Sequence, residues 1–168
     1  IAAASLNSQG GTISARNLSL NTGTGSVDNT NGTVSARAAA TIAAGNLVNR
    51  GGTLVAVGDV TAHVGSLDNT GGALGSQSGG LNVTSAGAID NAGGKLVAAQ
   101  DASLTGTSLG NQGGTLSARN LRVNTGAGAL DNSNGLVSAS GQVDLTTGSL
   151  VNHGGTLAAA GDVTARVA

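Results

Sequence analysis

Residues 88–101 read AIDNAGGKLVAAQD, and a ten-residue pattern inside this stretch decides the fold. The pattern is h-x-N-x-(G/N)-G-x-h-x-A, where h is an aliphatic residue, and eight copies fill the chain. The second glycine position of the eight copies is occupied by Gly11, Gly32, Gly52, Gly72, Gly94, Gly114, Gly135 and Gly155. Successive copies therefore begin 20 to 22 residues apart, which is a spacing typical of solenoid repeats.

Apolar and polar residues alternate within each copy. In residues 115–123 (TLSARNLRV), Leu116 and Ala118 enclose a serine, and Leu121 and Val123 enclose an arginine. A period of two indicates β-strands rather than helices. Each copy is expected to contain two or three strands of about three to five residues, separated by turns.

A unit of this size cannot bury the apolar side of its strands alone, so neighbouring units must stack. We predict an all-β fold, a right-handed parallel β-helix of about eight coils with about 20 residues per coil, because crossovers between parallel strands are right-handed. Residues 1–168 would form a single repeat array without separate domains, roughly 38 Å long at about 4.8 Å per coil. Leucine-rich repeats share the period but require a denser leucine pattern.

The position before the repeat glycine is restricted to two residue types. Glycine and asparagine are the residues that most readily adopt a positive φ angle. We therefore predict a left-handed backbone conformation in every turn. The eight residues of this column are Gly10, Asn31, Gly51, Gly71, Gly93, Gly113, Asn134 and Gly154.

A second column consists of asparagine in seven copies and of Ser8 in the first. Stacked coils would place these side chains about 4.8 Å apart, so that each amide donates a hydrogen bond to the next. The alternative is seven independent, exposed turn residues. The members of the predicted ladder are Asn29, Asn49, Asn69, Asn91, Asn111, Asn132 and Asn152.

The composition disfavours most binding and catalytic functions. Aromatic residues, Cys, Pro and Met are absent, and only 9% of residues are charged. The net charge of −1 shows no basic excess for binding nucleic acid, and no apolar run approaches the roughly 20 residues of a membrane span, so we expect neither nucleic-acid binding nor membrane insertion. Asp68 and Asp90 would be neighbours on adjacent coils but lack further acidic ligands, and His63 and His153 lie in different columns. We therefore predict no catalytic, cofactor-binding or metal-binding residues, and no cofactor.

Units such as SLDNTGGALGSQ (residues 66–77), AIDNAGGKLVAAQD (88–101) and LVNHGGTLAAAGDVTARV (150–167) resemble the filamentous haemagglutinin repeat. This repeat belongs to the large exoproteins of two-partner secretion, which include filamentous adhesins and contact-dependent growth-inhibition toxins. The resemblance covers essentially the whole chain. It implies a β-helical shaft, export through an outer-membrane partner transporter, and location outside the cell or on the bacterial surface. It also implies a role in adhesion, through host-cell glycans or a target-cell receptor, or in toxin presentation.

The leading functional hypothesis is therefore a non-catalytic structural shaft of a secreted surface exoprotein. A larger duplication supports it, because residues 5–65 match residues 108–168 at 37 of 61 positions, as expected where length matters more than any single site. The alternatives are a module that binds glycans or a receptor directly and, less favoured because aromatic sugar platforms are absent, a β-helical polysaccharide-acting enzyme. An ice-binding surface is disfavoured because the threonines, such as Thr22, Thr105 and Thr147, fall in no regular Thr-x-Thr column. The pattern is already under way at Ile1, so we expect the chain to be part of a longer protein.

Overall fold

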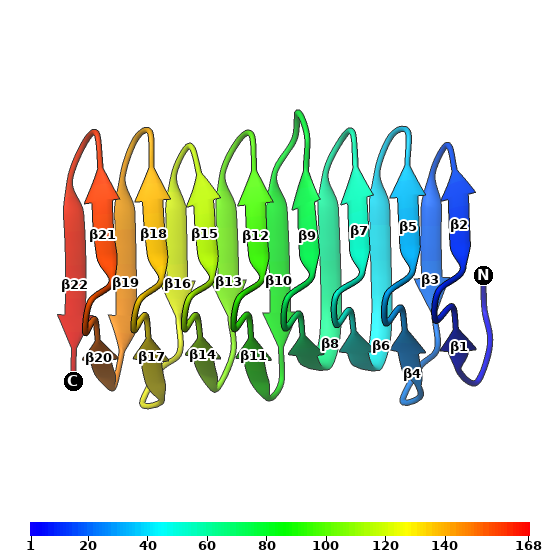
Figure 1. The fold of residues 1–168 in the computed structure, drawn as a ribbon, viewed down its shortest axis with the longest axis horizontal. Coiled ribbons are helices and arrows are strands. Elements are labelled where there is room, and N and C mark those ends of the chain that lie inside the picture. The colour runs from blue at the N-terminus through cyan, green and yellow to red at the C-terminus, as the bar shows by residue number, and fades with distance from the viewer.

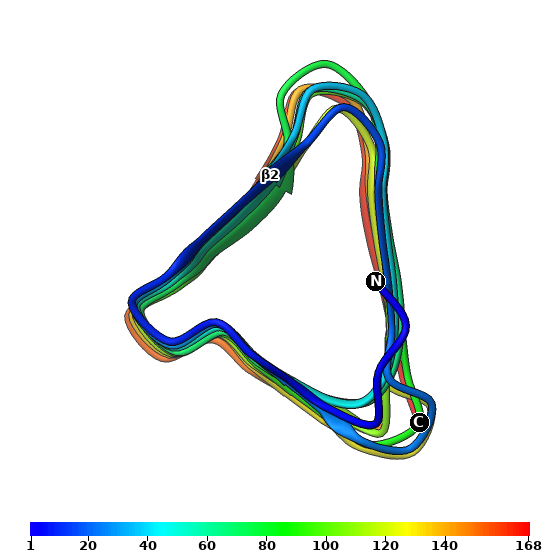
Figure 2. The ribbon, with the colours of Figure 1, turned by 90° about the vertical axis from the view of Figure 1, so that its right-hand side faces the viewer.

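A computed structural model describes all residues from Ile1 to Ala168 and contains only β-strands, turns and loops. The strands lie side by side along a rod, with the two termini at opposite ends (Figure 1). Seen from the N-terminal end, the chain runs clockwise as it recedes from the viewer, so the β-helix is right-handed (Figure 2). The predicted fold, a parallel β-helix of about eight coils, is confirmed. No helix is present that could cross a lipid bilayer.

Figure 2 shows a roughly triangular cross-section, and we call its three sides face I, face II and face III. Face I is an eight-stranded parallel sheet built from the strand that follows each Gly-Gly turn. Its strands are β2 (Thr12–Ala15), β5 (Thr33–Ala36), β7 (Thr53–Ala56), β9 (Ala73–Ser76), β12 (Lys95–Ala98), β15 (Thr115–Ala118), β18 (Leu136–Ala139) and β21 (Thr156–Ala159). Each strand pairs with its counterpart one coil away, so equivalent positions of the repeat stand in register.

Face II contains the second alternating segment of each coil. Its strands are β3 (Leu18–Asn21), the first part of β6 (Ala40–Val48), the first part of β8 (Val60–Asp68), β10 (Leu81–Ser85), β13 (Ala102–Thr105), β16 (Leu121–Asn124), β19 (Val143–Thr147) and β22 (Val163–Val167). All neighbouring pairs on this face are parallel. Face II is therefore as regular as face I.

Face III precedes the Gly-Gly turn and has shorter strands. They are β1 (Leu6–Asn7), β4 (Ser26–Asp28), the last part of β6 and of β8, β11 (Ala88–Asp90), β14 (Ser108–Gly110), β17 (Ala129–Asp131) and β20 (Ser149–Val151). The expected strand length of three to five residues is wrong for β6 and β8, which have 9 residues each. In these two coils Ala44 and Val64 continue the inward column, so one strand bends around the corner between faces II and III.

The core is a narrow column of aliphatic side chains along the axis of the rod. Its 32 buried members are leucine, valine, isoleucine and alanine only. Leu54, Leu74 and Leu96, for example, stand directly above one another and are at most 1% exposed. Aliphatic side chains alone therefore fill the interior, in a chain that contains no aromatic residue.

Candidate functional site

The asparagine column lies inside the β-helix, at the corner between faces III and I. Each side-chain Nδ2 donates to the Oδ1 of the asparagine one coil further on, at 2.7 to 2.8 Å, from Asn29 through to Asn152. It also donates to a backbone carbonyl of its own turn and to one in the next coil, as Asn29 does to Gly32 O (3.2 Å) and Thr53 O (3.1 Å). Six of the seven residues are fully buried, and Asn152, in the last coil, is exposed. The structure thus brings all seven into one continuous chain of hydrogen bonds.

This ladder has a direction and a defined start. Because every amide nitrogen points towards the C-terminal end, the first oxygen of the ladder depends on a donor from the preceding coil. Ser8 occupies that position, and Asn29 Oδ1 is the one buried side-chain polar atom without a hydrogen-bond partner. The serine therefore interrupts the ladder at the first coil.

The two glycines of each turn are needed for different reasons. The first position has φ between 54° and 64° in all eight coils, including the two non-glycine residues Asn31 and Asn134. The second glycine has no space for a side chain, because a Cβ at Gly52 would lie within 3 Å of both the Asn29 carbonyl oxygen and Asn49 Oδ1. Sequence reasoning explained the first requirement and missed the second, although an invariant glycine in eight copies was the available signal.

The carboxylates before the asparagine column serve the turns. Asp68 and Asp90 occupy equivalent positions in neighbouring strands of adjacent coils, as the sequence column predicted. Asp90 Oδ1 accepts a hydrogen bond from the backbone N–H of Ala92 (2.9 Å), and Asp68 Oδ1 accepts one from Thr70 (3.1 Å). Burial raises the pKa of Asp68, but hydrogen bonds from Thr70 and from Arg50, which also forms an ion pair at 2.5 Å, outweigh this effect and keep the pKa below its usual value.

Asp28 and Asp131 act in the same way in other coils. Burial raises the pKa of Asp28, but hydrogen bonds from Thr30 and Gln9 outweigh this effect and hold the pKa below its usual value. Hydrogen bonds from Ser133 lower the pKa of Asp131. No group of three or more potential metal-ligating side chains is present.

A second interior polar column, missed from the sequence, lies at the corner between faces II and III. Thr22, Ser85, Thr125 and Thr147 are buried there. Thr125 Oγ1 donates to Thr147 Oγ1 at 2.9 Å, and Thr147 Oγ1 donates to the Gly128 carbonyl at 2.8 Å. Two of the threonines taken as irregular in the sequence, Thr22 and Thr147, therefore share one column of the interior.

Face I carries a single column of threonines, without the second, parallel column that a Thr-x-Thr array requires. The column contains Thr12, Thr33, Thr53, Thr115 and Thr156. It is interrupted by Ala73, Lys95 and Leu136 at the equivalent positions. The interruptions leave no long flat threonine array on this face.

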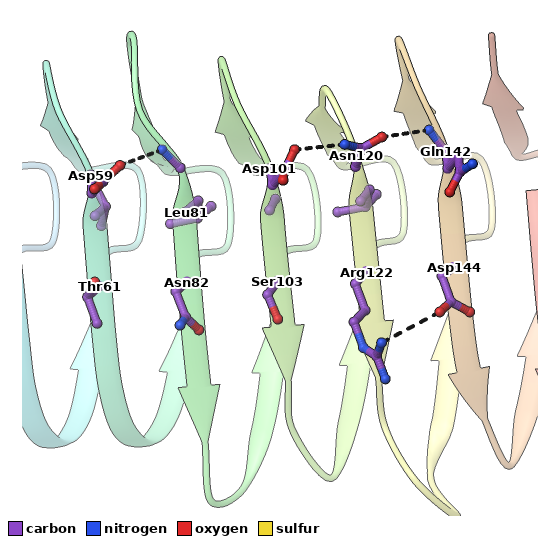
Figure 3. A pocket seen from close by; sticks show the side chains of 14 residues that line it. Asp59, Thr61, Leu81, Asn82, Asp101, Ser103, Asn120, Arg122, Gln142 and Asp144 are labelled. Atoms are coloured by element: carbon purple, nitrogen blue, oxygen red, sulfur yellow. Dashed lines mark hydrogen bonds and ion pairs between the residues drawn. The ribbon is translucent and has the colours of Figure 1, made fainter. Parts of the chain in front are cut away.

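Face II bears a shallow, open groove of about 540 Å³, which crosses β8, β10, β13, β16 and β19 (Figure 3). We call it the polar groove. Its floor consists of one outward side chain from each of five successive coils: Thr61, Asn82, Ser103, Arg122 and Asp144. Its rim, where the strands begin, consists of Asp59, Asp101, Asn120 and Gln142. No sequence argument identified this surface, because each coil contributes only one residue to the floor.

Hydrogen bonds between coils hold the rim in place. Asp59 Oδ1 accepts from the N–H of Gly80 (2.8 Å), and Asn120 Nδ2 donates to Asp101 Oδ1 (2.9 Å). Asn120 Oδ1 in turn accepts from the N–H of Gln142 (3.1 Å). Hydrogen bonds from Asn120 and from Arg119 hold the pKa of Asp101 below its usual value, so this carboxyl is ionised at neutral pH.

Arginine side chains neutralise part of the remaining charge. Arg122 and Arg166 flank Asp144 from adjacent coils, with N–O distances of 3.7 and 2.7 Å. Arg16 and Arg37 are exposed on neighbouring coils outside the groove. His63 and His153 are also exposed, and neither belongs to a group of three or more potential metal-ligating side chains.

Comparison with known protein families identifies the repeat. The model of the family described as haemagglutinin repeat matches residues 1–24, 13–93, 90–134 and 116–168, which together cover the whole chain. A comparison with curated proteins gives no match, and a comparison with solved structures gives none.

Proposed function

The chain belongs to the haemagglutinin repeat family, and we propose that it forms part of the stiff shaft of a large secreted bacterial surface protein. The family is a structural and adhesive one, and a β-solenoid of about eight coils fits such a shaft. In this proposal the chain is not an enzyme. Its role is to hold a binding or toxin region at a distance from the cell.

The observation that carries the proposal is the unbroken stacking of coils. On face I, eight strands pair in one parallel sheet from β2 to β21, and the asparagine ladder runs beside it through seven coils. In a solenoid each coil contacts only its neighbours, so the length of the rod grows in proportion to the number of coils. The interior ladder also fixes the register between coils, because a slipped coil would leave buried amides unpaired.

The composition supports export before folding. The chain contains no cysteine, which could form obstructing disulfides, and no proline, whose isomerisation takes tens of seconds. We propose that an outer-membrane partner transporter exports the unfolded chain, and that each coil then folds against the exposed edges of the previous one. The region presented by the shaft would contact a host-cell glycan or a target-cell receptor.

Deletions of defined length in the whole exoprotein test the shaft proposal. Removal of residues 53–72 takes out one period and joins Gly52 to Ala73, which occupies the same position of the repeat as Thr53. We expect the rod to shorten by about 4.8 Å, with unchanged circular dichroism and unchanged surface display. Removal of residues 53–62 alone would shift later coils out of register, and we expect loss of folding and display. Equal tolerance of the two deletions would overturn the proposal.

A further inference from the structure

The polar groove has the dimensions and the side-chain chemistry of a site for an extended polyhydroxyl ligand. We propose that it binds an uncharged polysaccharide that lies along the axis of the rod, across the strands of face II. This binding function is separate from the role as a shaft and does not depend on it.

The repeat of the groove sets the shape of its ligand. The floor residues Thr61, Asn82 and Ser103 come from adjacent coils in direct register, so their spacing is the strand spacing of about 4.8 Å. Figure 3 shows the five floor side chains in a row across the strands. An extended polymer that lies along the axis would therefore meet one floor side chain about every 4.8 Å, over a length of roughly 19 Å from the first floor residue to the fifth.

Hydrogen-bonding capacity in the groove is open to a ligand. The side chains of Thr61, Asn82 and Ser103 form no hydrogen bonds within the protein, and the second carboxylate oxygens of Asp59 and Asp101 are likewise free. These groups offer both donors and acceptors, as the hydroxyls of a sugar require. The bonds on the other carboxylate oxygens keep the rim fixed, so little order has to be gained on binding.

Charge and backbone geometry exclude other polymers. The groove contains the carboxylates of Asp59, Asp101 and Asp144, and these are balanced by the adjacent ion-paired side chains of Arg119, Arg122 and Arg166, so the groove has no excess of positive charge to attract a nucleic acid or a sulfated glycan. An extended peptide binds a sheet by adding a strand at its edge, whereas here the backbone groups are already paired on both sides. An uncharged polyol meets neither obstacle.

The absence of aromatic side chains limits the affinity of each contact. Without a stacking platform, binding relies on hydrogen bonds that compete with water, so an oligosaccharide of six sugars is expected to bind with a Kd on the order of 1 mM. Several sugars bound at once would raise the apparent affinity for a long polysaccharide.

A titration of the full chain with cellohexaose, followed by backbone amide chemical shifts in NMR spectra, tests the proposal. Shifts are expected for residues 59–61, 80–82, 101–103 and 120–122. The double variant Asn82→Ala/Ser103→Ala should raise the Kd about tenfold or more. The matched control is Ser14→Ala/Ser35→Ala, which changes two outward residues of adjacent coils on face I and should leave the Kd unchanged.

Other outcomes of the titration would overturn the proposal. These are an absence of shifts at 10 times the expected Kd (about 10 mM), shifts on another face, or equal weakening by the two double variants. A heparin hexasaccharide that binds more tightly than cellohexaose would also overturn it, because it would show that the site prefers anions. Unchanged circular dichroism in all variants separates a failure of binding from a failure of the rod to fold.

Discussion

The start of the asparagine ladder allows a gain-of-stability test of the interior. Asn29 Oδ1 is buried and lacks a hydrogen-bond donor, because the first coil has Ser8 where the other coils have asparagine. In the substitution Ser8→Asn, the new amide would lie between its own turn at Gly11 and the next coil. It could donate to Asn29 Oδ1 and to the Thr33 carbonyl, which match the two acceptors that Asn29 itself uses one coil further on.

The size of the effect follows from that change in hydrogen bonding. A net hydrogen bond contributes about 1 kcal/mol, and relief of an unpaired buried acceptor contributes a further 1 to 3 kcal/mol, while the longer side chain loses roughly 0.5 to 1 kcal/mol of rotamer freedom. We expect the free energy of unfolding to rise by about 1 to 3.5 kcal/mol. For a chain of this size, that corresponds to an increase in Tm of roughly 3 to 10 °C.

Urea unfolding followed by circular dichroism measures the overall change, and amide hydrogen exchange shows where it occurs. Solenoids fray from their ends, so increased protection is expected first in the two N-terminal coils. Two variants serve as controls. In Ser8→Asp, the aspartate side chain has nearly the same shape as asparagine but no N–H donor, so this variant should destabilise the chain. Ser5→Asn adds the same amide at an exposed position, so it should leave the stability unchanged. If Ser8→Asn were no more stable than the parent, or if Ser8→Asp stabilised equally, the account of the ladder would be refuted.

Further predictions concern the middle of the rod and its turns. The substitution Asn91→Asp removes a donor from the centre of the ladder and should cost about 3 kcal/mol or more in urea unfolding. Gly72→Ala should lower the Tm more than Gly71→Asn does. The first substitution forces a Cβ against buried oxygens, whereas the second places asparagine at a positive φ that this residue adopts in other coils. Equal decreases in Tm would contradict this difference. Asp28 and Asp131 have pKa values lowered by folding, so their contribution to stability is present above about pH 4 and is lost as the pH falls through the lowered values. The double variant Asp28→Asn/Asp131→Asn should therefore flatten the decrease in stability between pH 5 and about pH 2, and an unchanged slope would exclude these carboxylates as its cause.

The fold could be predicted from the sequence because every coil must meet the same physical requirements, so the same residue types recur at the same positions. An inward aliphatic residue stands at the position of Leu54 in every coil, so alignment of the eight copies of the repeat reveals this column from the sequence alone. The positive-φ column was accessible for the same reason. The bend in β6 and β8 was not, because it depends on whether the corner residue is aliphatic, as at Ala44 and Val64, or a hydroxyl residue such as Thr125.

The polar groove could not be found from the sequence. Its floor residues differ from coil to coil, so they form no motif, and only the register of the strands places Thr61, Asn82 and Ser103 in one row. The second glycine recurs in all eight coils and so gave a signal in the sequence, but only the coordinates show its cause, because the atoms that exclude a side chain at Gly52 belong to Asn29 and Asn49. Repeated features are thus open to sequence analysis, whereas features made of unlike residues on adjacent coils require coordinates.

Distances between spin labels test the stacking of coils most directly. The chain has no cysteine, so single-cysteine pairs can be labelled specifically at outward positions of one row on face II, namely Ser19, Thr41, Ser103 and Thr164. Stacked coils predict Cα separations of about 14 Å for Thr41 and Ser103, about 29 Å for Thr41 and Thr164, and about 34 Å for Ser19 and Thr164, in equal steps per coil. Separations that fail to increase by a constant step with each coil would contradict the β-helix and every conclusion drawn from it.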